Sequence, residues 1–174
     1  ASVEENLADA RKLAGMLRVL SEMNKPTIAR VQGAALGGGM GLASACDICV
    51  ASDKAVFATS EVKFGIIPAV ISPYVLRAIG PRQALRYFQS AERFNAVEAK
   101  AMGLVNEVAA LDELDAAVDR LVQALLACGP QAQLAAKQLI TSLTGRPIDA
   151  GQQRPADPVE QESQPAGGGE RHER

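Results

Sequence analysis

The hydrophobic pattern of the chain begins with a helical stretch. Apolar residues recur every three or four positions near the start: Leu7, Ala10, Leu13, Leu17 and Leu20. This period places them on one face of an α-helix, so we predict a helix over about residues 3–22. Ser2 and Glu5 stand three positions apart at its beginning, which is the arrangement of a capping box.

Short apolar and β-branched runs alternate with helical segments along the rest of the chain. The predicted strands cover residues 27–31, 48–52, 56–59 and 104–108. The predicted helices cover residues 42–46, 72–80, 81–90, 95–103, 112–127 and 130–143. Ser72 before Pro73 is expected to be an N-cap, and residues 60–69 a loop. Strands that alternate with helices indicate an α/β fold with parallel strands and a largely helical later region.

Composition divides the chain into three parts. Residues 1–108 carry the alternating strands and helices of a partial α/β core, and residues 109–144 form a helical region. Residues 145–174 are rich in Pro, Gly and Gln, and their only large apolar residues are Ile148 and Val159. Such a segment cannot bury enough apolar surface to offset its loss of conformational entropy, so we predict that it is disordered.

Charge and composition exclude several classes of function. The 174 residues carry a net charge of −2, which does not favour a nucleic-acid surface, and no apolar run is long enough to predict a membrane span. The N-terminal segment is acidic and amphipathic and resembles neither a signal peptide nor a transit peptide. The three cysteines, an odd number without framework spacing, indicate a reducing compartment, and we expect a cytoplasmic protein.

The chemistry open to the chain is limited by its histidine content. His172, the single histidine, lies in the polar C-terminal segment, so a histidine-based triad has no base in the folded region. Cys46 and Cys49 form a C-x-x-C pair, but too few further ligands remain for zinc, and we interpret both as buried reduced thiols. We therefore expect no metal site, and carboxyl groups become the candidates for proton transfer. Asp47 is expected to make local backbone hydrogen bonds.

A run of glycines is the most informative segment of the sequence. Gly37, Gly38 and Gly39 follow a predicted strand and precede a predicted helix. Glycine lets the backbone approach a ligand closely, and a helix N-terminus presents unpaired N–H groups with a partial positive charge. These properties suit a phosphate site or an oxyanion hole. The spacing matches neither a Walker A loop nor a dinucleotide-binding fingerprint, and a purely structural turn is the remaining alternative.

Glu61 is the second candidate for a functional residue. Between residues 55 and 74 the only charged residues are Glu61 and Lys63. A carboxyl group among apolar neighbours is suited to exchange protons near neutral pH, as an acid or base in catalysis does. The alternative is a solvent-facing glutamate that pairs with Lys63 or Arg77.

Three segments together resemble the enoyl-CoA hydratase/isomerase (crotonase) superfamily. They read KPTIARVQGAALGGGMGLASACDI, FATSEVKFGIIP and AVEAKAMGLVNEV, and they lie within residues 25–108 in the order and spacing of the family. The flanking helices, from about residue 5 to about residue 143, also fit. The resemblance implies a crotonase-like fold, in which a spiral of ββα units is followed by a helical C-terminal region.

The resemblance also implies roles for particular residues. The backbone N–H of Gly38 aligns with one half of the oxyanion hole in which the family holds an acyl-CoA thioester. Glu61 aligns with one of two glutamates that family hydratases use to add water to the α,β double bond. The other glutamate aligns with Gly41 and is absent. The residues implied to form the oxyanion loop and bind substrate are Ala35, Leu36, Gly37, Gly38, Gly39, Gly41 and Pro68.

The segment A-V-I-S-P-Y after Pro68 resembles a bacterial branch of methylglutaconyl-CoA and isohexenylglutaconyl-CoA hydratases, whose members also carry glycine at the position of Gly41. We therefore expect a hydratase of a branched enoyl-CoA, with coenzyme A as part of the substrate and no cofactor. An isomerase of the same family is one alternative, because Gly41 provides no second carboxylate. An inactive fragment is another, because the strand pair and loop that begin family subunits would precede Ala1. The family implies a trimer or a dimer of trimers.

Overall fold

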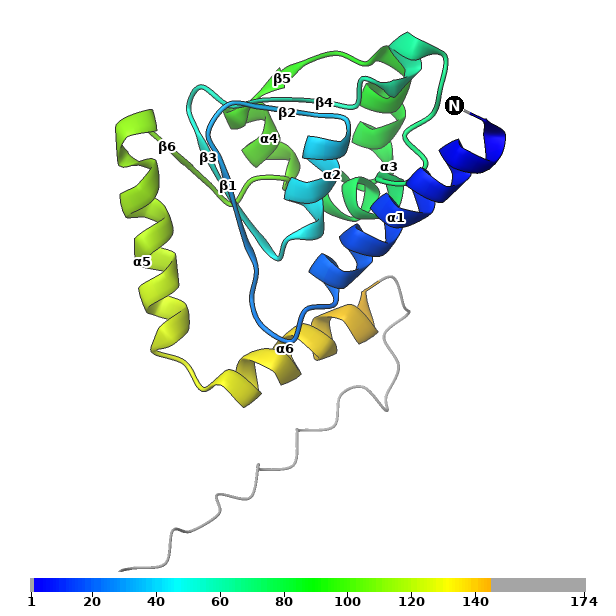
Figure 1. Cartoon of the computed structure of the whole chain (residues 1–174). Coiled ribbons are helices and arrows are strands. Elements are labelled where there is room, and N and C mark those ends of the chain that lie inside the picture. The colour runs from blue at the N-terminus through cyan, green and yellow to red at the C-terminus, as the bar shows by residue number, and fades with distance from the viewer. Residues whose placement is uncertain (1, 145–174) are drawn as a thin grey trace, which may run out of the picture.

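The first four strands alternate between two small sheets in the computed structural model, which describes residues 2–144 (Figure 1). The first sheet has the order β1-β3-β6, and its strands Ile28–Val31, Ile48–Ser52 and Glu107–Ala109 are all parallel. The second has the order β2-β4-β5 and consists of Ala34–Leu36, Val56–Ala58 and Phe94–Asn95, with β5 antiparallel to β4. The parallel arrangement predicted from the sequence therefore holds for every pair except β4–β5.

The chain winds as a spiral of ββα units. Strands β1 and β2 lead into α2 (Gly38–Ala45), and β3 and β4 lead through the 3-10 helix η1 (Glu61–Phe64) into α3 (Ser72–Ser90). Each unit adds one strand to each sheet, since Ile28 pairs with Ile48 in the first sheet and Ala34 with Val56 in the second. This arrangement is the crotonase-like fold expected from the sequence.

The helices follow the sequence pattern closely. Helix α1 (Val3–Ser21) begins with the predicted capping box of Ser2 and Glu5 and buries Leu17 against the core. Helix α4 (Ala96–Met102) begins with a second capping box. Helix α3 combines the two helices predicted over residues 72–90, with a kink at Gly80, where φ is 72° and ψ is 167°. Its N-cap is Ile71, so the prediction of Ser72 at that position was wrong.

Two apolar clusters hold these elements together. The larger contains the stacked rings of Phe57 and Phe94, whose centroids lie 5.8 Å apart, and Tyr87, whose ring lies 4.5 Å from that of Phe94. It joins β4 and β5 to α3. The smaller cluster consists of Val50, Leu114 and Ala117 and joins β3 to α5.

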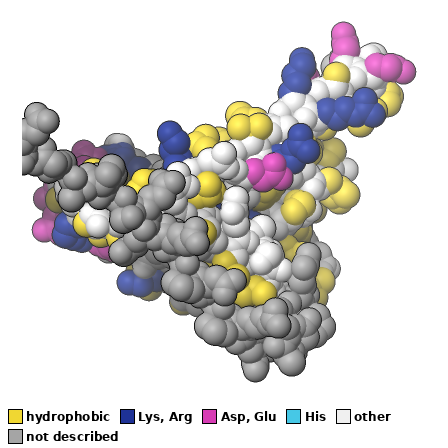
Figure 2. Space-filling view, turned by 90° about the horizontal axis from the view of Figure 1, so that it is seen from below, with side chains coloured by type: hydrophobic (Ala, Val, Ile, Leu, Met, Phe, Trp, Pro, Cys, Tyr) yellow, Lys and Arg dark blue, Asp and Glu magenta, His cyan; other side chains and the backbone are white. Residues whose placement is uncertain are grey.

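The C-terminal helices α5 and α6 lie on the outside of the core. Helix α5 (Leu114–Leu126) follows a short 3-10 helix, η2 (Leu111–Glu113), and covers the β1-β3-β6 sheet. Helix α6 (Pro130–Leu143) lies beneath the C-terminal end of α1 (Figure 1) and contains no buried residue. Seen from below, basic, acidic and apolar side chains are interspersed on the described part of the surface (Figure 2).

Several predicted boundaries differ from the structure. Strands β2 and β5 were not predicted, α2 begins at Gly38 rather than at residue 42, and β6 begins three residues later than expected. The predicted loop over residues 60–69 contains η1. The disorder predicted for residues 145–174 lies outside the described residues. No helix within residues 2–144 is long and apolar enough to cross a membrane.

Candidate active site

The glycine run forms the turn from β2 into α2. Gly37 is the N-cap of α2, with φ 50° and ψ −117°, and its N–H donates to the carbonyl of Ala58 at 2.9 Å. Gly38 and Gly39 are the first two residues of the helix, where N–H groups have no intrahelical acceptor. No side chain among the described residues caps this end, and a Cβ added at Gly38 or Gly39 would meet nothing within 4 Å. Within residues 2–144, the N–H groups of Gly38 and Gly39 therefore have no hydrogen-bond acceptor.

The carboxyl group of Glu61 lies against this turn. A Cβ added at Gly37 would stand 3.3 Å from Glu61 Oε1 and 3.7 Å from Glu61 Cδ. Glycine at this position thus serves two purposes, since its positive φ disfavours other residues and its bare Cα leaves room for the carboxyl group. The structure brings together the two features that the sequence analysis identified separately.

One oxygen of Glu61 has no partner among the described residues. Oε2 is buried and accepts no hydrogen bond there. None of the ion pairs within residues 2–144 involves Glu61, and Lys63 is exposed, so the structure does not support the alternative in which Glu61 pairs with Lys63 or Arg77. A buried polar atom without a partner is costly, and a water molecule or a substrate group bound at Oε2 would satisfy it.

Position 41 cannot carry a side chain in this packing. Gly41 is buried, and a Cβ added to it would stand 2.9 Å from the Cβ of Ile71 and closer still to Ile71 Cγ2. The absence of a carboxylate at position 41, read from the sequence, is therefore built into the contact between α2 and α3. Sequence reasoning did not single out Ile71. A glycine inside a short helix of small residues was the available signal, because it indicates close packing.

The remaining predicted site residues occupy supporting positions. Ala35 and Leu36 belong to β2 and pair with Phe57 and Ala58 of β4. Pro68 is buried before α3, and its carbonyl accepts a hydrogen bond from the N–H of Ser72 at 3.0 Å. Their backbone groups hold β2 beside β4 and connect the chain to the start of α3.

Exposed apolar side chains follow Glu61 along the chain. Phe64, Ile66 and Ile67 are 78%, 60% and 74% exposed. A groove of about 390 Å³ runs along β1 and β2 to α2 and includes Ala35 and Gly39 among its walls. Open space and apolar surface therefore lie beside the N-terminal end of α2.

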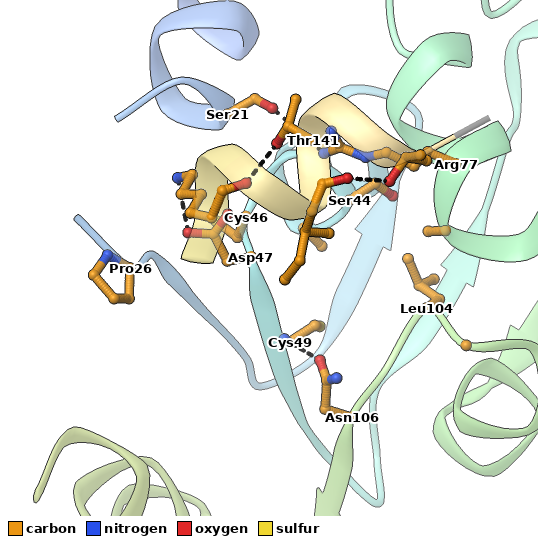
Figure 3. A pocket seen from close by; sticks show the side chains of 16 residues that line it. Ser21, Pro26, Ser44, Cys46, Asp47, Cys49, Arg77, Leu104, Asn106 and Thr141 are labelled. Atoms are coloured by element: carbon orange, nitrogen blue, oxygen red, sulfur yellow. Dashed lines mark hydrogen bonds and ion pairs between the residues drawn. The ribbon is translucent and has the colours of Figure 1, made fainter. Parts of the chain in front are cut away.

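A larger cavity of about 550 Å³ lies at the opposite end of α2 (Figure 3). Burial raises the pKa of the Cys49 thiol to about 12 and also raises the pKa of Cys46, so neither thiol ionises readily. Both are free, but only Cys49 is buried as predicted; Cys46 is half-buried. We assign this cavity to packing rather than to chemistry, because its thiols are neutral and Asp47 is paired with Lys137.

Asp47 differs from its predicted role. Instead of local backbone bonds, its Oδ2 accepts from the N–H and the hydroxyl of Thr27, at 2.9 and 3.0 Å, and from Lys137 Nζ at 2.8 Å. It thereby ties the start of β1 to α6. Within residues 2–144, no three His, Cys, Asp or Glu side chains gather closely enough to hold a metal ion.

Comparison with known proteins places these features in a family. The sequence model of the family "Enoyl-CoA hydratase/isomerase" matches residues 5–155. A crystal structure of an enoyl-CoA hydratase from Shewanella pealeana superimposes with a TM-score of 0.82 and 46% identity, covering 87% of this chain and 57% of that one.

Curated proteins of the same family are also similar. The hydroxycinnamoyl-CoA hydratase-lyase of Pseudomonas fluorescens is 37% identical over 121 residues, which are 69% of this chain and 44% of that protein. The crotonyl-CoA hydratase of Syntrophomonas wolfei is 39% identical over 115 residues, 66% of this chain and 44% of that protein. The chain thus spans about half the length of the curated relatives it matches.

Proposed function

The chain belongs to the enoyl-CoA hydratase/isomerase family, and on that premise we propose that it adds water to the double bond of an α,β-unsaturated acyl-CoA thioester. The observation that carries this proposal is the position of Glu61, whose carboxyl group lies against Gly37 at the N-terminus of α2. A proton carrier and a group of backbone donors thus share one small region. Coenzyme A enters as part of the substrate.

The N–H of Gly38 is the proposed oxyanion donor. Addition to the double bond places negative charge on the thioester oxygen, and a helix N-terminus stabilises that charge through its free N–H groups and its dipole. One such donor is worth about 3 kcal/mol in the transition state, or roughly a hundredfold in rate. We infer that a second donor and further coenzyme A contacts come from parts of the family fold that this chain does not match, since the matched segments are 44% of each of these relatives.

Glu61 is the proposed acid and base. As the oxygen of a water molecule bonds to the β-carbon, the Glu61 carboxylate takes one proton from that water, and the electrons of the double bond move toward the thioester oxygen. The protonated Glu61 then gives its proton to the α-carbon. The sum is one added water molecule, with Glu61 returned to its starting state. Such acid–base catalysis contributes about 10²–10⁴-fold to the rate.

The acyl group is proposed to be branched and of the methylglutaconyl type. Support comes from the sequence between Pro68 and Tyr74 and from glycine at position 41. The relatives bear names that cover several acyl groups, among them crotonyl-CoA and hydroxycinnamoyl-CoA, so this choice rests on the sequence of the present chain.

A panel of enoyl-CoA thioesters, including methylglutaconyl-CoA, tests the proposal through the loss of absorbance of the conjugated thioester. Glu61→Gln should abolish turnover while leaving the thermal unfolding midpoint near that of the parent, because the exchange keeps the size of the side chain. Glu4→Gln, at an exposed position of α1, is the matched control and should retain full activity. Equal turnover by Glu61→Gln and the parent would refute the assignment of Glu61.

An isomerase of the same family is the second candidate, favoured by the absence of a second carboxyl group at Gly41. One carboxyl group suffices to move a proton from the α- to the γ-carbon. Products formed in ¹⁸O-labelled water separate the two, since only hydration incorporates the label. A folded chain without either activity would indicate an inactive fragment.

We also propose that the chain assembles as a trimer or a dimer of trimers. The exposed apolar side chains of Phe64, Ile66 and Ile67 support an interface near the site. Light scattering coupled to gel filtration measures the mass directly, and a monomer at micromolar concentration would contradict this part of the proposal.

A further inference from the structure

Two glycines at the start of α2 contact different side chains. Gly37 and Gly41 are joined by the first hydrogen bond of the helix, from Gly41 N–H to Gly37 C=O at 3.1 Å, and so lie one turn apart. The carboxyl group of Glu61 lies against the first position, and the side chain of Ile71 against the second. The Glu61 carboxyl group and the Ile71 side chain therefore lie against successive turns of the chain at the start of α2.

Ile71 is fixed in that place by its surroundings. It is 2% exposed, it is the N-cap of α3, and it belongs to the main apolar cluster together with Leu17 of α1. Leu17 also reaches Gly41, since a Cβ added there would stand 3.7 Å from Leu17 Cδ1. Leu17 of α1 and Ile71 at the N-cap of α3 therefore fill the space beside Gly41. A side chain at position 41 has no room while Ile71 is present.

We propose that Ile71 is a specificity-determining residue of this site: by filling the space at Gly41, it excludes a second carboxyl group from the turn of α2 that follows the glycine which Glu61 contacts. The site is then limited to reactions in which a single carboxyl group both takes and returns the proton. The chemical part of this inference rests on the proposed function. The exclusion itself is a matter of packing and can be tested without any substrate.

Thermal unfolding of glycine variants tests the exclusion. Gly41→Ala should lower the midpoint by roughly 3–10 °C, because the added methyl group overlaps Ile71. Gly39→Ala, in the same helical turn but beside open space, is the matched control and should not lower the midpoint.

In an Ile71→Gly background, the loss of thermal stability caused by Gly41→Ala should disappear. If Ile71→Gly does not fold, Ile71→Ala should relieve part of the loss, since it removes Cγ2 and keeps Cβ. An equal loss in both backgrounds would overturn the exclusion.

A second pair of variants tests the effect on Glu61. Gly41→Glu/Ile71→Gly places a second carboxyl group beside Glu61, whereas Gly41→Gln/Ile71→Gly is its neutral control. In a ¹³C NMR titration of the glutamate carboxyl groups, with Glu61→Gln used to assign the signal, the Glu61 signal should move differently with pH in the first variant and in the second, because two nearby carboxylates repel each other. Identical titration curves would overturn the proposal.

Activity measurements distinguish a failure of this inference from a failure of the proposed function. If the parent turns over enoyl-CoA, the pH dependence of kcat/KM should show one additional ionisation in Gly41→Glu/Ile71→Gly relative to Gly41→Gln/Ile71→Gly, which a purely structural role of Ile71 would not produce. If the parent has no activity, the proposed function fails, while the unfolding and titration experiments still decide whether Ile71 excludes a second carboxyl group.

Discussion

Asp47→Ala should destabilise the protein far more than loss of the ion pair alone. The Asp47 carboxylate accepts three hydrogen bonds, two from Thr27 and one from Lys137. Thr27 is 8% exposed, and the Lys137 and Asp47 side chains are 16% and 27% exposed, so all three groups are largely removed from water. Truncation to alanine would leave the Thr27 N–H and the Lys137 ammonium without this acceptor.

The expected loss in the free energy of unfolding follows from the polar groups that Asp47→Ala leaves without a hydrogen-bond partner. An unsatisfied buried N–H costs about 1–3 kcal/mol, and an ammonium group deprived of a partly buried carboxylate adds about 2 kcal/mol. We therefore expect a loss of about 3–5 kcal/mol for Asp47→Ala. Lys137→Met should cost only about 1–2 kcal/mol, because Asp47 keeps both bonds to Thr27.

Urea unfolding measures both losses, and hydrogen exchange along α6 shows where they act. Both variants should lose amide protection in α6, since Lys137 is its anchor to the body of the protein. Lys12→Met removes an exposed pair with Asp9 (side chains 79% and 76% exposed) and should change stability by less than about 0.5 kcal/mol. Equal losses for Asp47→Ala and Lys137→Met, or unchanged protection of α6, would refute the reasoning.

Two further predictions concern the glycine turn and the thiols. Gly37→Ala should cost about 1–3 kcal/mol in urea unfolding, because φ is 50° there and the new Cβ presses on the Glu61 carboxyl group; stability equal to the parent would contradict this. In the folded protein at pH 8, a disulfide reagent should modify the exposed Cys128 first and leave Cys49 unmodified, because burial holds the pKa of Cys49 at about 12. Mass spectrometry identifies the modified thiol, and equal rates would contradict the prediction.

The features that the sequence predicted well are those with local causes. Both capping boxes, Ser2 with Glu5 and Asn95 with Glu98, depend on residues three apart and were recognisable as short patterns. Helix α1 was correct to within a residue at each end because its apolar period spans many turns. The fold class followed from the alternation of strands and helices and from the resemblance of three motifs.

The features that it missed depend on distant partners. Strand β5 has only two residues and exists because Phe94 and Asn95 pair with β4, a contact that no local pattern reports. The glycine run was interpreted as a loop before a helix, although Gly38 already belongs to the helix, because glycine has a low helix propensity and its role here is set by the turn. The position of Ile71 against Gly41 likewise depends on tertiary packing.

Strand pairing also fixes the distance between the glycine turn and Glu61. Gly37 follows β2 directly, Glu61 follows β4 after two residues, and the two strands are neighbours that end in register at Leu36 and Ala58. Their separation is therefore governed by the inter-strand distance of about 4.8 Å, a constant of backbone hydrogen bonding that side-chain substitutions hardly alter. Substitutions in the surrounding core can then change how readily the protein unfolds while the spacing between Glu61 and the N–H groups of the glycine turn stays the same. In the proposed hydratase, changes in the acyl group accepted would accordingly arise in the segment between Glu61 and α3, which lies outside the paired strands.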